Sequence, residues 1–388
     1  GYNPNSTYAC PSSYDVGGQA FKNYESHSYG SIDLARALSV SCDTVFYKLA
    51  NEMWLKDGGL NPSGTPAEAM YTAARDFGLG KKTGIDIPGE TTGRVVGREQ
   101  KKADYAERKD DFCRRATEGY PEVKPADRAA LLQSYAKDFC AEGDKFRAGD
   151  ALNFAIGQGD TVVTPLQMNM VYSAIANGGT LWKPTVAKAA VSREGELRKE
   201  FEPTSNGNVT ASDSTLSFLR KALSQTTVTG TASGAFRGFP LSQIPVAAKT
   251  GTGEVVGKAS TSWFASFAPA NSPKYAVTCM VSQGGTGAGT CGPSVRAIYE
   301  ALLGVNGSSV SPGKSILSGG KPSSKLPDVT SDGIGQSAPN GGAAVAPPAE
   351  PSPAPPGGES PAPAPLPAAE VPRGFVNSPG ASATRSSG

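Results

Sequence analysis

The sequence predicts an α+β fold, in which helices come early in the chain, an antiparallel sheet comes late and a last helix covers that sheet. Apolar residues recur at three- and four-residue steps in the first part of the chain, for example over residues 31–54. Between residues 244 and 283 the pattern changes to β-rich runs separated by Gly, Pro, Asn and Ser. Together these observations predict a mixed α/β sandwich.

The first predicted helix covers residues 31–54. Its apolar residues would bury one face, and Ser31 is placed to cap the first turn. Two further helices carry the same start signal, a capping box with proline at the first helical position: T-P-A-E at 65–68 and T-P-L-Q at 164–167. We expect the helix after the first box to end at Gly78 and the helix after the second to end at Gly178.

The middle of the chain predicts an insertion. Residues 99–148 are highly charged and indicate an inserted helical segment. It ends before N-F-A-I-G-Q-G-D at 153–160, where small and flexible residues predict a tight loop that supports a buried part of the molecule.

The late β-rich runs predict the sheet itself. I-P-V-A-A-K-T-G-T-G-E, T-S-W-F-A-S-F-A-P-A and K-Y-A-V-T-C-M-V-S-Q would form a three-stranded antiparallel meander. A helix from Gly292 to Leu303, with Val295, Ile298, Tyr299 and Leu302 on one face, would pack against it.

Composition divides the chain into two parts. Beyond Tyr299 the only aromatic residue is Phe375, and the sequence is dominated by Pro, Ala, Ser and Gly. Such a stretch lacks the apolar side chains that a core needs. We expect a folded domain over residues 1–304 and a disordered Pro/Ala/Gly/Ser-rich tail over 305–388.

Bulk charge excludes some function classes. The net charge is +2 and the basic residues are interspersed with acids, so nucleic acid is not an expected partner. No run reaches the roughly 18 apolar residues that span a bilayer.

His27 is the only histidine and no C-x-x-C pair occurs, so we expect no metal site and no cofactor. A lone histidine in a polar loop is expected to be solvated.

The six cysteines suit an oxidising compartment. Cys113 and Cys140 bracket a hairpin-like helical stretch, and Cys279 and Cys291 bracket a Gly-rich turn, so these two disulfides are expected. Cys10 with Cys42 is the pairing left over. Six buried thiols remain the alternative, because sequence alone does not determine connectivity.

The first chemical signal is Lys249-Thr250-Gly251 on the first strand of the meander. Lys249 would supply a cation for a substrate carboxylate, and the hydroxyls of Thr250 and Thr252 would donate hydrogen bonds to it. The lack of a side chain at Gly251 would let a substrate backbone lie along the strand. The alternative is a surface strand with a glycine bulge.

The second signal is Ser41-Cys42-Asp43 in the middle of the predicted helix. Serine and aspartate compete for backbone hydrogen bonds and are poor residues for a helix interior. They indicate either a polar site or surface positions of the helix.

Together the two signals resemble the motifs of the penicillin-binding protein and serine β-lactamase superfamily, S-x-x-K, S-x-N or S-x-D, and K-T-G on a strand. The flanking runs G-I-D-I-P-G-E-T-T-G-R-V, N-F-A-I-G-Q-G-D-T-V-V-T-P-L-Q, V-A-A-K-T-G-T-G-E and S-W-F-A-S-F-A-P are similar to class B penicillin-binding proteins of the elongation type, the penicillin-binding protein 2 branch. The resemblance covers residues 1–304 and implies the antiparallel sheet and helices of the transpeptidase fold.

The resemblance implies a serine-type peptidoglycan D,D-transpeptidase that cross-links stem peptides ending in D-Ala-D-Ala and binds β-lactams covalently. Ser41 would relay a proton between the substrate amine and the lysine of S-x-x-K, and Asp43 would position that lysine. Lys249, Thr250 and Thr252 would bind the substrate carboxylate, and the Thr252 N–H would supply half the oxyanion hole. Trp263 and the loop at 153–160 would support the cleft.

One departure from the family pattern concerns the nucleophile. S-x-x-K belongs upstream of Ser41, and the matches in this chain lie downstream of it, at Ser134, Ser311 and Ser318. We treat these as chance, and expect the nucleophilic serine and its lysine to precede Gly1 and the chain alone to be inactive. Asp43 in place of asparagine would pair more strongly with that lysine.

The resemblance also implies a setting, the extracytoplasmic face of the bacterial plasma membrane, with an anchor outside this chain and elongation-complex membrane proteins as partners. A D,D-carboxypeptidase or a β-lactam sensor would share the motifs. A non-catalytic scaffold of the cell-wall machinery, with a vestigial cleft and a recruiting tail, is the alternative from another class.

Overall fold

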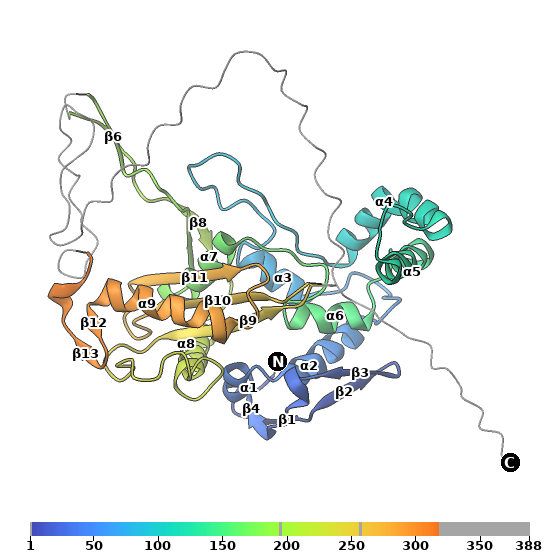
Figure 1. Cartoon of the computed structure of the whole chain (residues 1–388), viewed down its shortest axis with the longest axis horizontal. Helices are drawn as coiled ribbons and strands as arrows, with labels where there is room; N and C mark the ends of the chain where they lie inside the picture. The colour runs from blue at the N-terminus through green and yellow to red at the C-terminus, as the bar shows by residue number, and fades with distance from the viewer. Residues whose placement is uncertain (1, 194–195, 256–257, 318–388) are drawn as a thin grey trace.

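A three-stranded antiparallel sheet forms the centre of the computed structural model, which describes residues 2–193, 196–255 and 258–317. Its strands are β9 (Ala247–Gly253), β10 (Thr261–Ala268) and β11 (Tyr275–Val281), in the order β11-β10-β9 (Figure 1). The predicted meander is therefore confirmed. Strand β10 pairs with both neighbours, and β9 lies at the edge of this sheet.

Helices cover both faces of the sheet (Figure 1). Side chains alternate along β10, so that Phe264 packs with helix α9 (Gly292–Leu303) on one face. Phe267 packs on the other face with α7 (Pro165–Asn177) and α8 (Asp213–Val228). The result is a helix–sheet–helix sandwich, the α+β architecture that the sequence predicts.

Helix α9 has the bounds predicted from the sequence. Val295 and Tyr299 are buried in the core as expected, and Leu302 packs against it. Ile298, which was predicted on the same face, is 42% exposed. That part of the prediction is wrong, because Ile298 points away from the strip that touches the sheet.

The prediction of one helix over residues 31–54 is also wrong. The segment divides into strand β4 (Gly30–Asp33), α1 (Leu34–Val40) and α2 (Asp43–Lys56). The cap is Asp33, whose carboxylate accepts from the Arg36 N–H, and not Ser31.

The two predicted capping boxes have different outcomes. At α7, Thr164 and Gln167 cap each other reciprocally, so that box is confirmed. Helix α3 (Ala69–Asp76) begins later than predicted, after Glu68 with a φ of 44°, and no side chain caps it. The box predicted at residues 65–68 is therefore wrong.

Residues 7–33 form two strand pairs beside α1 and α2. Strand β1 (Thr7–Cys10) pairs with β4, and β2 (Ser13–Val16) pairs with β3 (Gln19–Lys22). A disulfide joins Cys10 to Cys42 at the junction of α1 and α2. A small core forms there from Cys10, Val40 and Val45 among others.

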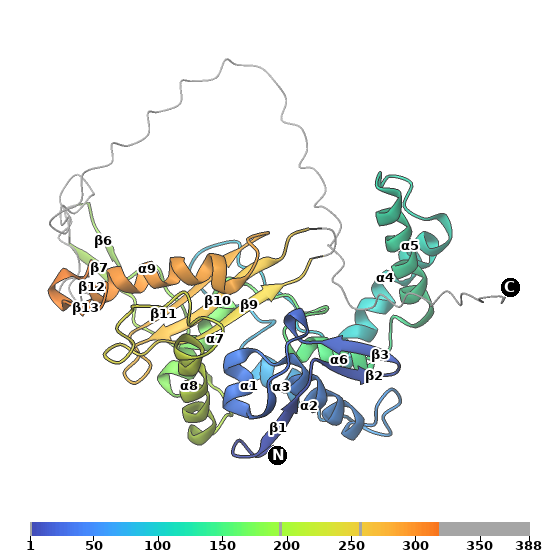
Figure 2. The same ribbon diagram turned by 60° about the horizontal axis from the view of Figure 1, so that its bottom comes forward.

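The charged stretch forms a pair of helices that projects from the body (Figure 2). These are α4 (Arg98–Glu118) and α5 (Ala126–Glu142), joined by the Cys113–Cys140 disulfide. The short helix α6 (Ala148–Ala155) follows and packs against α2.

Short strand pairs complete the described residues. Strand β5 (Thr180–Trp182) pairs with β8 (Ser205–Asn208), and β6 (Ala189–Val191) pairs with β7 (Leu197–Glu200). After α9, β12 (Val305–Asn306) pairs with β13 (Ser309–Val310).

The expected boundary at residue 304 falls just before Val305, which is buried in the core. Residues 318–388 of the predicted tail lie outside the described residues. Among the described helices, none is both long and apolar enough to cross a bilayer.

Candidate active site

Ser41 lies at a sharp corner between α1 and α2. It adopts the left-handed conformation, with φ 58° and ψ 53°, and the next N–H, of Cys42, donates to the Ala37 carbonyl at 2.8 Å. Glycine is the usual residue in this helix-ending conformation, and a non-glycine residue there costs roughly 1 kcal/mol or more. The surrounding structure must therefore hold the corner.

Three contacts from residues 10–23 hold it. Cys42 is bonded to Cys10, the Thr44 N–H donates to Asn23 Oδ1 at 2.9 Å, and the Thr44 hydroxyl donates to the Pro11 carbonyl at 2.9 Å. The break also places Asp43 in the first turn of α2, where the unpaired N–H groups of the helix favour a carboxylate.

Lys249 connects strand β9 to the corner at Ser41. Its Nζ donates to Ser41 Oγ at 2.9 Å and to the Thr250 carbonyl at 2.8 Å. The two sequence signals, which lie 208 residues apart, thus meet in one site.

The environment shifts both ionisable groups. Burial raises the pKa of Asp43 to about 6, against the lowering effect of Lys249 and with a further increase from Glu254. Burial lowers the pKa of Lys249 to about 8, while Asp43 acts in the opposite direction. Both groups therefore change charge close to neutral pH, as is common in catalytic sites.

A turn after α8 closes the site beside Lys249. The Thr231 and Thr250 hydroxyls lie 2.6 Å apart, and the Thr231 N–H donates to the Ser39 carbonyl at 3.1 Å. A Cβ at Gly230 would lie 2.2 Å from that Ser39 oxygen, so only glycine allows the turn to approach α1 this closely.

Gly251 packs against the protein itself. A Cβ there would lie 3.0 Å from Trp263 Cβ, and the backbone of Gly287 lies so close that its own Cβ would meet the Gly251 oxygen at 2.6 Å. The missing side chain makes room for Trp263 and for the turn that ends in the Cys279–Cys291 disulfide. Its expected role toward a substrate backbone stays a prediction.

A cleft of about 870 Å³ opens along the free edge of β9. Ser41, Asp43 and Lys249 line it together with Thr250 and Thr252.

The opposite rim comes from residues 22–29 and includes Tyr24, Glu25 and His27. The His27 imidazole is exposed and lies 3.9 Å from the Glu25 carboxylate. Within the described part of the chain, no cluster of three or more His, Cys, Asp or Glu side chains could hold a metal ion.

The serines of the S-x-x-K matches that fall on described residues do not line this cleft. Ser134 is on α5 of the projecting helix pair, and Ser311 follows β13. Ser318 lies outside the described residues.

Sequence reasoning missed Thr231 and the rim at residues 22–29. The only local signal at Thr231 is a Thr-Gly-Thr turn, and the rim reads as an ordinary polar loop. Their place in the cleft follows from contacts between distant segments.

Comparison with known proteins identifies the family. The model of the penicillin binding protein transpeptidase domain matches residues 1–302. The chain belongs to this family. The strand with Lys249 and the corner with Ser41 are thus parts of a transpeptidase domain.

The relatives are of the penicillin-binding protein 2 type, as the sequence resemblance predicted. The peptidoglycan D,D-transpeptidase MrdA of Acinetobacter baumannii is 26% identical over 298 residues, which cover 73% of this chain and 36% of the relative. MrdA of Haemophilus influenzae is 24% identical, with 73% and 38% covered. The chain therefore spans a little over a third of the length of these relatives.

Solved structures agree in fold. Penicillin-binding protein 2 of Helicobacter pylori in complex with MreC has a TM-score of 0.56 at 25% identity, covering 77% of this chain and 46% of that one. Penicillin-binding protein 2 of Pseudomonas aeruginosa in complex with WCK 5153 has a TM-score of 0.56 at 23% identity, covering 79% and 58%.

Proposed function

We propose that residues 1–304 carry the carboxylate-binding and proton-relay side of a peptidoglycan D,D-transpeptidase site. The observation that supports this most strongly is the hydrogen bond from Lys249 to Ser41, because it joins both family motifs in one cleft. Lys249, Thr250 and Thr252 bind the terminal carboxylate of a D-Ala-D-Ala stem peptide, or the carboxylate of a β-lactam.

The reaction has two acyl transfers. A serine Oγ attacks the carbonyl of the D-Ala-D-Ala bond, its proton passes to the departing amine, and D-Ala leaves. An amine of a second stem then attacks the ester and returns its proton to the serine. Ser41 passes the proton, Asp43 orients the lysine beside the nucleophile, and the Thr252 N–H stabilises the oxyanion.

The nucleophile in this proposal is the serine of an S-x-x-K segment that is not in the sequence given. This sequence alone then takes no penicillin label. In the cell the site faces the extracytoplasmic side of the plasma membrane, beside membrane proteins of the elongation machinery. The H. pylori relative, solved in complex with MreC, is consistent with such a partner.

Gel labelling with a fluorescent penicillin tests the assignment. The chain is compared with one extended upstream through S-x-x-K, and with a Ser-to-Ala variant of the extension. Labelling of the extended chain only, and only with its serine, is expected. Absence of label on the extended, folded chain would favour the non-catalytic scaffold instead.

The cation on strand β9 has its own test. Lys249→Met in the extended chain should lower the labelling rate by about tenfold or more, as expected from loss of a charged hydrogen bond to the ligand. Lys274→Met, in the exposed turn between β10 and β11, is the matched control and should label as the parent does. Release of D-Ala without cross-linked product would indicate a D,D-carboxypeptidase.

The pH dependence follows from the charge that Lys249 must carry. With a pKa of about 8, its ammonium group is present below pH 8 and is lost above it. Binding of a D-Ala-D-Ala peptide to the Ser-to-Ala extended chain should therefore weaken by up to about tenfold per pH unit above that value. Binding that is flat to pH 10 would remove Lys249 from this role.

A further inference from the structure

The loop between α6 and α7, residues 156–164, touches the candidate site from one side and helix α4 from the other. On the side of the site, Gln158 Nε2 donates to the Thr252 carbonyl at 3.1 Å. Gln158 and Asn153 also line the cleft. The loop therefore reaches the strand that carries the K-T-G motif.

The position of this contact on β9 shows which way the Thr252 backbone groups point. Thr252 stands opposite Ser262 of β10, and its carbonyl points to the other side, where Gln158 lies. The Thr250 carbonyl, two residues earlier, also points away from β10 and accepts from Lys249. Because both backbone groups of an extended residue point to the same side, the Thr252 N–H faces the cleft as well.

The loop itself is held in a defined shape. Gly157 and Gly159 have φ values of 75° and 85°, which favour glycine, and the Gln158 N–H donates to the Asn153 carbonyl at 2.9 Å. Behind the loop, Arg94 Nε donates to the Asp160 carbonyl at 3.1 Å. The Gln158 side chain thus leaves a loop that is fixed at both ends.

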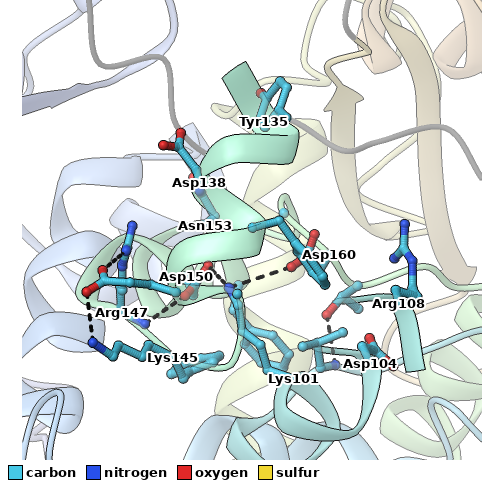
Figure 3. Close-up of a pocket in the computed structure, with 18 of the residues that line it drawn as sticks. Lys101, Asp104, Arg108, Tyr135, Asp138, Lys145, Arg147, Asp150, Asn153 and Asp160 are labelled. Atoms are coloured by element: carbon cyan, nitrogen blue, oxygen red, sulfur yellow. Dashed lines mark hydrogen bonds and ion pairs between the residues drawn. The ribbon is translucent and has the colours of Figure 1, made fainter. Parts of the chain in front are cut away.

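Helix α4 supplies the support on the far side. Lys101 Nζ lies 2.6 Å from Asp150 Oδ1 and 3.8 Å from Asp160 Oδ2 (Figure 3). The side chains of Lys101 and Asp150 are only 15% and 14% exposed, so salt screens their attraction less than at the surface. Asp150 Oδ2 also accepts from the Arg147 N–H and caps α6.

The Asp160 carboxylate depends on this cation. Burial raises its pKa, Lys101 lowers it, and Asp150, Arg94 and Asp104 add smaller effects. Removal of Lys101 would leave two carboxylates facing each other without their shared cation, which favours displacement of the loop.

We propose that Gln158 is a positioning residue that, through the Thr252 carbonyl, holds the Thr252 backbone with its N–H toward the cleft, and that Lys101 of the projecting helix pair braces the loop that carries Gln158. The catalytic part of this inference rests on the proposed function, in which that N–H stabilises the oxyanion. The structural part, in which the loop couples α4 to β9, does not depend on the proposed function.

Hydrogen exchange in the full chain tests the coupling without any ligand. Gln158→Ala should speed exchange of the Gly251 and Gly253 amides about fivefold, the size expected for loss of one hydrogen bond. Gln243→Ala, an exposed glutamine in the turn before β9, is the matched control. Unchanged exchange in Gln158→Ala, or an equal change in both variants, would overturn the coupling.

Lys101 is tested in the same way. Lys101→Met should speed exchange in residues 157–160 and in β9, and Lys101→Arg should restore most of the protection. Lys102→Met is the control, because Lys102 is exposed and pairs with the surface residue Glu99. Faster exchange confined to residues 157–160 would show that α4 supports the loop but does not reach the strand.

Penicillin kinetics in the extended chain test the catalytic part. Gln158→Ala should lower the acylation rate constant by about tenfold, less than complete loss of an oxyanion donor, with little change in the dissociation constant of the initial complex. A wild-type rate in Gln158→Ala would refute the positioning role while leaving the proposed function intact. If the extended parent is not labelled at all, the proposed function and the catalytic part fall together, and the exchange result still decides the coupling.

Discussion

Similar runs, T-P-A-E at 65–68 and T-P-L-Q at 164–167, precede α3 and open α7, but only the second forms a cap. The run T-P-L-Q at 164–167 forms a reciprocal box, in which Thr164 Oγ1 accepts from the Gln167 N–H and Gln167 Oε1 accepts from the Thr164 N–H. The run T-P-A-E at 65–68 forms none, and its helix starts at Ala69.

The difference comes from partners outside each run. The Asp57 carboxylate accepts from the N–H groups of Ala67 and Glu68, at 3.2 and 3.0 Å, and so takes the Glu68 N–H that a box would use. The Glu68 carboxylate is drawn away to the Arg98 N–H at 2.8 Å. A capping motif forms only where no stronger acceptor competes for its donors.

At α7, contacts with distant residues stabilise the same Gln167 side-chain position as the local capping box does. Gln167 is buried, and its Nε2 donates to the carbonyls of Lys81 and Thr92, both at 2.7 Å. One side chain therefore caps the helix and fastens the segment at 81–92. Variants at the two helix starts test whether this difference between local and distant partners holds.

The largest effect is expected at Gln167. Gln167→Ala removes three hydrogen bonds from a buried place and leaves two carbonyls without this donor, which should lower the free energy of unfolding by about 3 kcal/mol. Urea denaturation measures it, with the exposed Gln243→Ala as control. A cost below 1 kcal/mol would show that the tertiary contacts contribute little.

Asp57 should come second. Asp57→Ala removes an ionised acceptor from two backbone donors, and we expect a loss of about 1.5 kcal/mol. The exposed Asp138→Ala on α5 should be close to neutral in the same denaturation experiment. If Asp57→Ala were also neutral, the hydrogen bonds from the Ala67 and Glu68 N–H groups to Asp57 would contribute little to stability.

Thr164→Ala is expected to cost about 1 kcal/mol, the usual value for an N-cap hydroxyl. Thr164→Ser retains the acceptor oxygen and should recover most of the stability. Equal losses in the two variants would mean that the threonine methyl group, and not the cap, is responsible.

The smallest effect is expected at Thr65. Because its hydroxyl caps nothing in the structure, Thr65→Ala should change the free energy of unfolding by less than about 0.5 kcal/mol. Thermal and urea denaturation beside Thr164→Ala provide the matched pair. A loss as large as that of Thr164→Ala would show that the box at 65–68 forms in solution.

In the candidate site too, some features depend on local sequence and others on contacts between distant residues. Its motifs could be read from the sequence, since Lys249 lies on a β-rich run and Ser41-Cys42-Asp43 is a poor helix interior. The corner at Ser41 could not, because serine has no local preference for the left-handed conformation that it adopts. Of the polar residues that looked misplaced inside one helix, Ser41 ends α1 and Asp43 begins α2.

The sequence by itself determined the sheet, helix α9 and the box at α7, because each depends on neighbours within one strand, one helix turn or one meander. Only the tertiary structure decided the corner at Ser41, the start of α3 and the contact of Gln158 with Thr252. That contact joins residues 94 positions apart, and the contact of Lys249 with Ser41 joins residues 208 apart. Such pairs leave no periodic trace in the chain, since their energy depends on how separate elements pack.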